Sequence, residues 1–139
     1  KDEPDFAGFY LTKLKLVKMP PSEEIALLEH ATVLNPNDWR IALTLSENHL
    51  NNNETTKAIA IGETFINRFP ENSQIGMNYT SALLKDKQYL KALTFLESFN
   101  ILPFEGATEG KKIYTLACIK LALQSYEQQE YEKAEHNQK

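Results

Sequence analysis

An internal repeat of 34 residues is the feature of this sequence that most constrains its fold. Four pairs of chemically similar residues share this separation: Pro36 and Pro70, Leu45 and Tyr79, Ser46 and Thr80, and Ala58 and Ala92. Within each repeat, apolar residues recur at three- and four-residue spacings, a period typical of amphipathic helices and not of strands. Because two-helix units need neighbours to cover their apolar faces, the repeat predicts a stack of antiparallel helix pairs.

We expect at most eight helices, separated by residues that interrupt or cap helical structure. Pro20 and Pro21 cannot continue a helix, and Ser22 is expected to cap the helix that follows them. Asp38 is a second cap candidate, and the three asparagines at 51–53 favour a turn. The expected helices cover residues 6–18, 23–34, 38–51, 55–68, 73–85, 88–101, 108–128 and 131 onward.

Small residues also recur where paired helices would approach each other closely. They lie on the first helices at Thr12, Ser46, Thr80 and Ala122, and on the second helices at Ala58, Ala92 and Ala134. Together with the prolines near the unit ends, these positions resemble the tetratricopeptide repeat, a unit of two helices in 34 residues. The resemblance implies one all-α domain, a right-handed α-α superhelix of stacked antiparallel helix pairs. Its units would cover residues 5–38, 39–72, 73–106 and an extended, truncated unit at 107–139.

The sequence departs from the repeat pattern at three places. Glu24 stands where an alanine is expected, and Gly62 stands where a large residue fills the gap between units, a gap that Phe65 is expected to fill. The last unit is displaced by an insertion around residues 102–110 (LPFEGATEG). This tract resembles the C-terminal repeat region of a family of large bacterial proteins with a β-rich region of uncharacterised function. That resemblance implies that the chain is part of a larger polypeptide.

Charge and hydropathy exclude several classes of partner. The formal net charge is -4, so the chain lacks the clustered basic face that nucleic acid or anionic lipid requires. Its apolar runs are much shorter than the roughly 20 residues of a membrane-spanning helix. We therefore expect a soluble protein that binds neither nucleic acid nor membrane. The single cysteine, Cys118, assigns no compartment.

The sequence carries no motif that indicates catalysis. It has no metal-binding pair of histidines, no glycine-rich phosphate loop and no nucleophile elbow. His49 occupies a position where the repeat usually has tyrosine, so we expect it to be a partly buried packing residue. Carboxylate pairs such as Glu127 and Glu130 are expected on solvated faces. The sequence thus predicts no enzyme activity, no catalytic residue, no metal and no cofactor.

The repeat resemblance implies that the first helices line a concave face, which here is mostly apolar. The residues expected to contact a partner on it are Phe9, Lys13, Leu43, Glu47, Leu50, Met77, Ser81 and Leu84. In the last unit, Leu116, Ile119, Leu123 and Tyr126 are expected to point to the same side. A clamp for an acidic peptide terminus needs paired cations, and Thr44, Gln74 and Asn78 occupy that neighbourhood. Such a clamp is therefore disfavoured.

Two functions are consistent with the sequence, one based on this face and one on the tract at 102–110. In the first, the chain is a non-catalytic scaffold that binds a protein or peptide, or docks another domain of the same polypeptide, on the apolar surface. The alternative is that the chain is the C-terminal accessory domain of a larger carbohydrate-active or sugar-binding bacterial protein.

Overall fold

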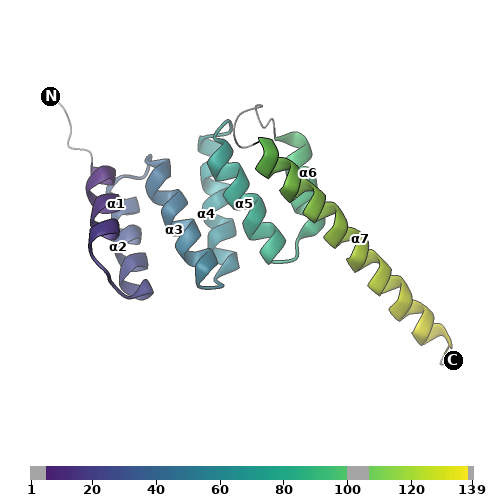
Figure 1. The fold of residues 1–139 in the computed structure, drawn as a ribbon. Coiled ribbons are helices and arrows are strands. Elements are labelled where there is room, and N and C mark those ends of the chain that lie inside the picture. Colours follow the sequence, from purple (N-terminus) through teal and green to yellow (C-terminus); the bar gives the residue numbers. More distant parts are fainter. Residues whose placement is uncertain (1–5, 100–106, 138–139) are drawn as a thin grey trace.

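The computed structural model describes residues 6–99 and 107–137, and within these ranges the chain forms seven α-helices and no strand (Figure 1). The helices are α1 (Phe6–Leu16), α2 (Pro21–Leu34), α3 (Trp39–Asn51), α4 (Thr55–Arg68), α5 (Ser73–Lys85), α6 (Tyr89–Ser98) and α7 (Ala107–Asn137). Each helix packs against the next one along the chain. The predicted all-α fold class is confirmed: the chain is a stack of helix pairs of the tetratricopeptide type.

The first helix of each pair lies on one side of the stack and the second on the other (Figure 1). The main chains of α1 and α3, of α3 and α5, and of α5 and α7 approach each other closely. Among the described residues, no such approach joins α2 to α4 or α4 to α6. The first helices of successive pairs therefore lie closer together than the second helices do. The stack curves accordingly, with the first helices on its concave side.

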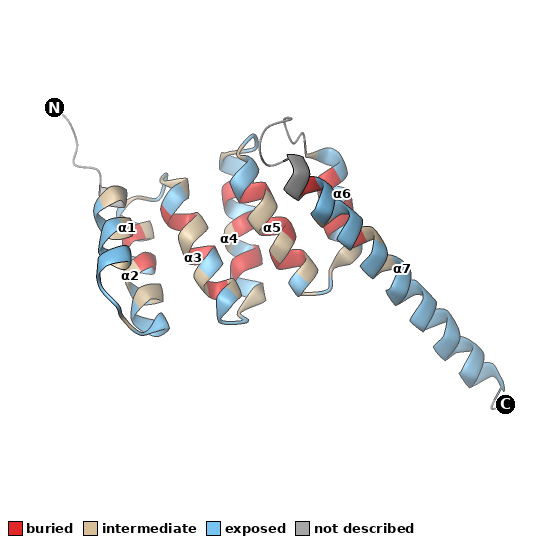
Figure 2. Cartoon of the chain, in the orientation of Figure 1, coloured by how far each residue is buried: buried red, intermediate tan, exposed pale blue. Residues whose placement is uncertain are grey.

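Three buried clusters hold the pairs together, and the red segments of Figure 2 mark their members. The central cluster consists of Ala58, Ile59, Tyr79, Ala82, Leu83 and Ala92. A second cluster joins Leu28 and Ala31 of α2 to Ile41 and Leu45 of α3, and a third contains Ala42, Phe65 and Ile75.

The small residues of the middle units have the expected role. Ala58 and Ala92 are fully buried, and Ser46 and Thr80 are buried opposite them. Small side chains let two helix axes come within roughly 8 to 10 Å. Among the remaining small positions, Thr12, Ala122 and Ala134 are exposed, so close packing of this kind is restricted to the middle of the stack.

The expected gap at Gly62 is filled by a tyrosine. A Cβ atom added to Gly62 would lie 2.7 Å from Cδ2 of Tyr79. Phe65, the residue expected to compensate, is buried in the third cluster and lines a small gap together with Gly62. The glycine therefore makes room for the Tyr79 ring between α4 and α5.

Of the two helix caps predicted from the sequence, the structure confirms one and contradicts the other. The Asp38 side chain accepts a hydrogen bond from the Arg40 backbone N–H, which confirms Asp38 as the cap of α3. The expectation for Ser22 is wrong, because α2 begins at Pro21 and has no side-chain cap. Proline is preorganised for the first helical position, so Ser22 lies inside the first turn.

Two turns between paired helices have the same left-handed geometry. Asn53 and Lys87 have φ angles of 62° and 61°, and each residue follows the end of a first helix. The Asn53 and Glu54 N–H groups donate to the carbonyls of Leu50 and His49, and the corresponding bonds recur after α5. This double pattern is the Schellman motif, which ends α3 and α5.

The expected break before residue 131 is absent, and α7 continues without interruption to Asn137. Gln129 corresponds to Asn53 and Lys87 when Ala134 is aligned with Ala58 and Ala92. The eight residues after Tyr131 contain a single apolar side chain, Ala134. Glu and Lys residues, which favour helix, surround Gln129 and Tyr131, so the local sequence continues α7 through this position.

Candidate protein-binding face

The structure places the predicted contact residues on successive first helices of the stack. Phe9 and Lys13 belong to α1, Leu43, Glu47 and Leu50 to α3, and Met77, Ser81 and Leu84 to α5. Within each helix these residues are separated by three or four positions and so share one side of it. We call this set of eight residues the inner face. Their role in partner binding remains a prediction.

The leucines of the inner face are shared between the surface and the core. Leu50 and Leu84 are half-buried and pack against the central cluster. Leu43 is also half-buried and lines a small enclosed gap beside Ala42 and Phe65. These three side chains therefore stabilise the stack with one part of their surface and present the remainder to solvent.

Glu47, Met77 and Ser81 occupy the middle of the inner face and belong to none of the three clusters. Met77 is half-buried, and the Ser81 hydroxyl donates a 2.9 Å hydrogen bond to the Met77 carbonyl one turn earlier. Glu47 is exposed, yet partial desolvation by its neighbours raises the pKa of its carboxyl group. This face thus combines apolar surface with one exposed, partly desolvated acidic group.

Polar contacts fix α3 and α5 relative to each other beneath this face. The Ser46 hydroxyl donates to Oδ1 of Asn78 over 2.5 Å, although the two residues are 32 positions apart. Nζ of Lys85 donates to the Leu50 carbonyl at the end of α3. Asn78, which lies in the neighbourhood where a carboxylate clamp would need cations, instead accepts this hydrogen bond between units. The inner face is consequently preorganised.

At the two ends of the stack the apolar side chains are more exposed. Phe9 on α1 is 65% exposed, and Lys13 beside it is also exposed. On α7, four apolar residues have exposed fractions between 45% and 62%: Leu116, Ile119, Leu123 and Tyr126. The inner face therefore continues onto α7 as a stripe of large, exposed side chains.

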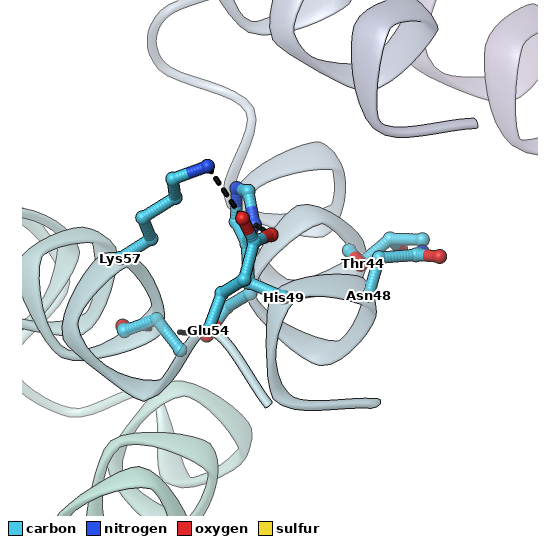
Figure 3. A network of polar contacts seen from close by, with 7 residues as sticks. Thr44, Asn48, His49, Glu54 and Lys57 are labelled. Carbon is cyan, nitrogen blue, oxygen red and sulfur yellow. Dashed lines mark hydrogen bonds and ion pairs between the residues drawn. The ribbon is translucent and has the colours of Figure 1, made fainter. Parts of the chain in front are cut away.

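A cluster of polar contacts surrounds the turn between α3 and α4 (Figure 3). His49 is only 2% exposed, and its Nδ1 lies 2.7 Å from Oε2 of Glu54. Nζ of Lys57 donates to the other carboxylate oxygen over 2.7 Å. Hydrogen bonds from Lys57 and then from His49 hold the pKa of Glu54 below its ordinary value. His49 is buried more deeply than the partial burial expected from its place in the repeat.

This cluster lacks the composition of a metal site. Across residues 6–99 and 107–137, no group of three His, Cys, Asp or Glu side chains is placed to hold a metal ion. The Glu54 carboxylate already bonds to His49 and Lys57, so its contacts explain the turn geometry without a ligand.

Within residues 6–99 and 107–137, no helix combines the length and the apolar character that membrane crossing requires.

Arg40 is a charged residue next to this face that sequence reasoning did not assign. Its guanidinium contacts the Asp38 carboxylate through Nε at 3.1 Å and Nη2 at 2.8 Å. The same contacts lower the pKa of Asp38. The separation of two residues between an N-cap aspartate and an arginine is the signal that would have predicted this pair.

Comparison with known proteins supports the fold. No family model matches the sequence, and no curated protein matches it. A solved structure described as a MamA RS-1 ArsTM double mutant is similar to this chain, with a TM-score of 0.68 and 19% sequence identity. The match covers 83% of this chain and 63% of that one, so this chain spans less than two thirds of its neighbour. MamA is a helical repeat protein of the tetratricopeptide type, and the likeness concerns the fold alone.

Proposed function

We propose that this chain is a scaffold that binds a protein or peptide on its inner face, through the eight residues from Phe9 to Leu84 defined above. The observation that carries the proposal is the row of half-buried apolar side chains Leu43, Leu50, Met77 and Leu84, which lie on two adjacent helices joined by the Ser46–Asn78 hydrogen bond. A surface that is already ordered loses little conformational entropy when it binds a partner. Apolar side chains on such a surface favour an amphipathic helix or an apolar peptide.

Glu47 narrows the chemistry of this partner. Its carboxyl group lies between Leu43 and Leu50 on α3 and is exposed, while partial desolvation raises its pKa. A cation or an N–H donor on the partner would compensate this charge and strengthen binding. The best ligand is therefore a peptide with apolar residues flanking one lysine or arginine.

The experiment uses a displayed library of such peptides selected on the 139-residue chain, followed by anisotropy titrations with the selected peptides. Substitutions at Leu50 or Leu84 would also disturb the core, so the informative variants are Met77→Glu and Ser81→Arg. Each is expected to weaken binding by at least about tenfold. Glu47→Gln should weaken basic peptides selectively.

Thr64→Arg on α4 is the matched control for Ser81→Arg. Both hydroxyls donate to the carbonyl four residues earlier, and Thr64 is exposed on a second helix, away from the inner face. The control should leave the affinity unchanged. The proposal fails if the selected peptides bind the Ser81→Arg and Met77→Glu variants as tightly as the original chain while circular dichroism shows both variants folded.

The alternative, an accessory role in a larger carbohydrate-active or sugar-binding protein, rests on the tract 102–110, most of which lies outside the described residues. No side chain of the described residues favours it over the binding role. Docking of another domain of the same polypeptide on the inner face would be tested by the same variants.

A further inference from the structure

The last helix of the stack has apolar residues on two opposite sides. One side packs against α6 and α5: Gly110 and Ala117 are buried, and Ile113 and Leu121 are half-buried. The opposite side carries the exposed stripe of Leu116, Ile119, Leu123 and Tyr126. Beyond Leu121, every described residue of α7 is exposed, and Figure 2 shows this half extending away from the stack.

The exposed stripe has a spacing that reads the same in both directions. Its six positions are Lys112, Leu116, Ile119, Leu123, Tyr126 and Glu130, separated by four, three, four, three and four residues. At 100° per residue all six lie within one side of the helix, over about 27 Å of its length. A second α7 running antiparallel would therefore place Leu116 opposite Tyr126 of the second copy and Ile119 opposite Leu123 of the second copy.

The distribution of charged residues along α7 also favours an antiparallel pair. The end of the stripe near the stack carries a lysine, Lys112, and the distal end carries a glutamate, Glu130. Over the whole helix, the first half contains Lys111, Lys112 and Lys120 against one acidic residue, Glu109. The second half contains Glu127, Glu130, Glu132 and Glu135 against one lysine, Lys133, which pairs with Glu130 over 2.9 Å. The two halves therefore carry net charges of opposite sign. In an antiparallel pair each basic half faces an acidic half, whereas a parallel pair would bring like charges together.

The surface at the basic end also has a shape that suits this register. Lys111, Lys112, Thr115, Leu116 and Ile119 line a shallow, mainly apolar hollow on α7. The antiparallel register brings the ring of Tyr126 of the second copy over Leu116, inside this hollow. Tyrosine is well suited to such a position because its ring covers apolar surface while its hydroxyl stays at the edge.

We propose that two copies of this chain associate through antiparallel α7 helices, with the two-fold axis close to Leu121. The interface is isologous, so each stripe covers the other and the pairing closes at two copies. It also supports the distal half of α7, whose described residues beyond Leu121 are all exposed. A helix with so little packing is marginal alone. This pairing uses α7 and does not rest on the proposed binding role of α3 and α5.

The first experiment measures the mass of the 139-residue chain by sedimentation velocity over a concentration series. The chain should form a dimer, and Leu123→Glu should raise the dissociation constant by at least about tenfold. Ser125→Glu is the matched control, because Ser125 is also an exposed α7 residue but lies off the stripe. Both variants should keep their helical circular dichroism, since neither side chain is buried.

The second experiment tests the register by disulfide trapping, with Cys118 replaced by serine in all proteins. A mixture of Leu116→Cys and Tyr126→Cys chains should form a mixed disulfide, while Leu116→Cys alone should not cross-link. Charge reversal provides an independent test: Lys112→Glu and Glu130→Lys should each weaken the dimer, and the double variant should restore it.

Three outcomes would overturn the proposal. The first is a chain that stays monomeric at every concentration, which would leave the stripe to a further segment of the same polypeptide or to a foreign protein. The second is a dimer that Leu123→Glu does not weaken. The third is efficient cross-linking of Leu116→Cys to itself, which would indicate a parallel arrangement.

Discussion

Nδ1 of His49 lies 2.7 Å from Oε2 of Glu54, and this contact joins the last turn of α3 to the residue that precedes α4. The Glu54 N–H donates to the His49 carbonyl over 2.9 Å, so the same two residues are linked through the main chain as well. His49 is nearly inaccessible to solvent, and Glu54 is at the surface beside Lys57. The contact therefore neutralises the polar edge of a buried ring at the point where the chain reverses direction.

Glu54→Gln should lower the thermal stability of the chain at neutral pH. Hydrogen bonds from Lys57 and His49 depress the pKa of the folded carboxyl below 4.5, its ordinary value. Such a group stabilises the fold above its unfolded pKa, and the contribution disappears as the pH falls through the folded pKa. The difference in melting temperature between the original chain and the variant should thus be largest at neutral pH and should shrink as the pH falls below 4.5. A difference that does not change with pH would contradict this account.

Gly62→Ala should destabilise the protein, although the substitution lies inside a helix. In an open helical position alanine is favoured over glycine by about 1 kcal/mol. Here the new Cβ would lie 2.7 Å from the buried Tyr79 ring, which is held in the central cluster. We expect a net loss of about 1 to 3 kcal/mol in the free energy of unfolding, measured with urea.

The Tyr79→Ala background supplies the control for this prediction. With the ring removed, Gly62→Ala should become neutral or stabilising, because only the helix propensity remains. Gly76→Ala should lower the free energy of unfolding less than Gly62→Ala does. Its new Cβ would meet the ring of Phe99, the C-cap residue of α6, which is only half-buried. Equal losses in both backgrounds would show that the clash with Tyr79 is not the cause.

The hydrogen bond between Ser46 and Asn78 should appear as an energetic coupling between two repeat units. Ser46 is 1% exposed and donates to Oδ1 of Asn78 over 2.5 Å. Ser46→Ala should cost about 1 kcal/mol, and a double-mutant cycle with Asn78→Ala should give a coupling of similar size. Ser81→Ala is the control, because its hydroxyl bonds only within its own helix. Additive losses at Ser46 and Asn78 would refute the coupling.

The repeat period and local signals were enough to predict most of the helices. Asp38 and the asparagines at 51–53 act locally, so their roles in capping and turning could be predicted from neighbouring residues. The continuity of α7 could not, because Tyr131 and Ala134 match the period of a second helix. Whether that helix folds back depends on how much surface it can bury, a tertiary quantity that periodicity does not report.

The candidate site was predictable in position but not in detail. The spacing of Leu43, Glu47 and Leu50 places them on one side of α3 whatever their neighbours are. How much of each leucine is used by the core depends on the distance between units, and the packing of Leu50 and Leu84 against the central cluster follows only from the folded structure. The contact between Ser46 and Asn78 could not be predicted from the sequence either, because it joins residues 32 positions apart and depends on how the units stack.

Glycine at one equivalent position of three repeat units, Asn53, Lys87 and Gln129, should change the stability differently: it should stabilise the two turns and destabilise α7. Lys87 has a φ of 61°, a conformation that costs a residue with a Cβ about 1 kcal/mol or more. Lys87→Gly should therefore stabilise the chain by about 0.5 to 1 kcal/mol in urea unfolding, after allowance for the greater freedom of glycine in the unfolded state. Asn53→Gly should have a smaller effect, because asparagine tolerates the left-handed region. Gln129 occupies the equivalent position inside α7, where glycine costs about 1 kcal/mol, so Gln129→Gly should reduce helical circular dichroism. A gain of stability in Gln129→Gly would show instead that the chain turns there and that α7 is two helices in solution.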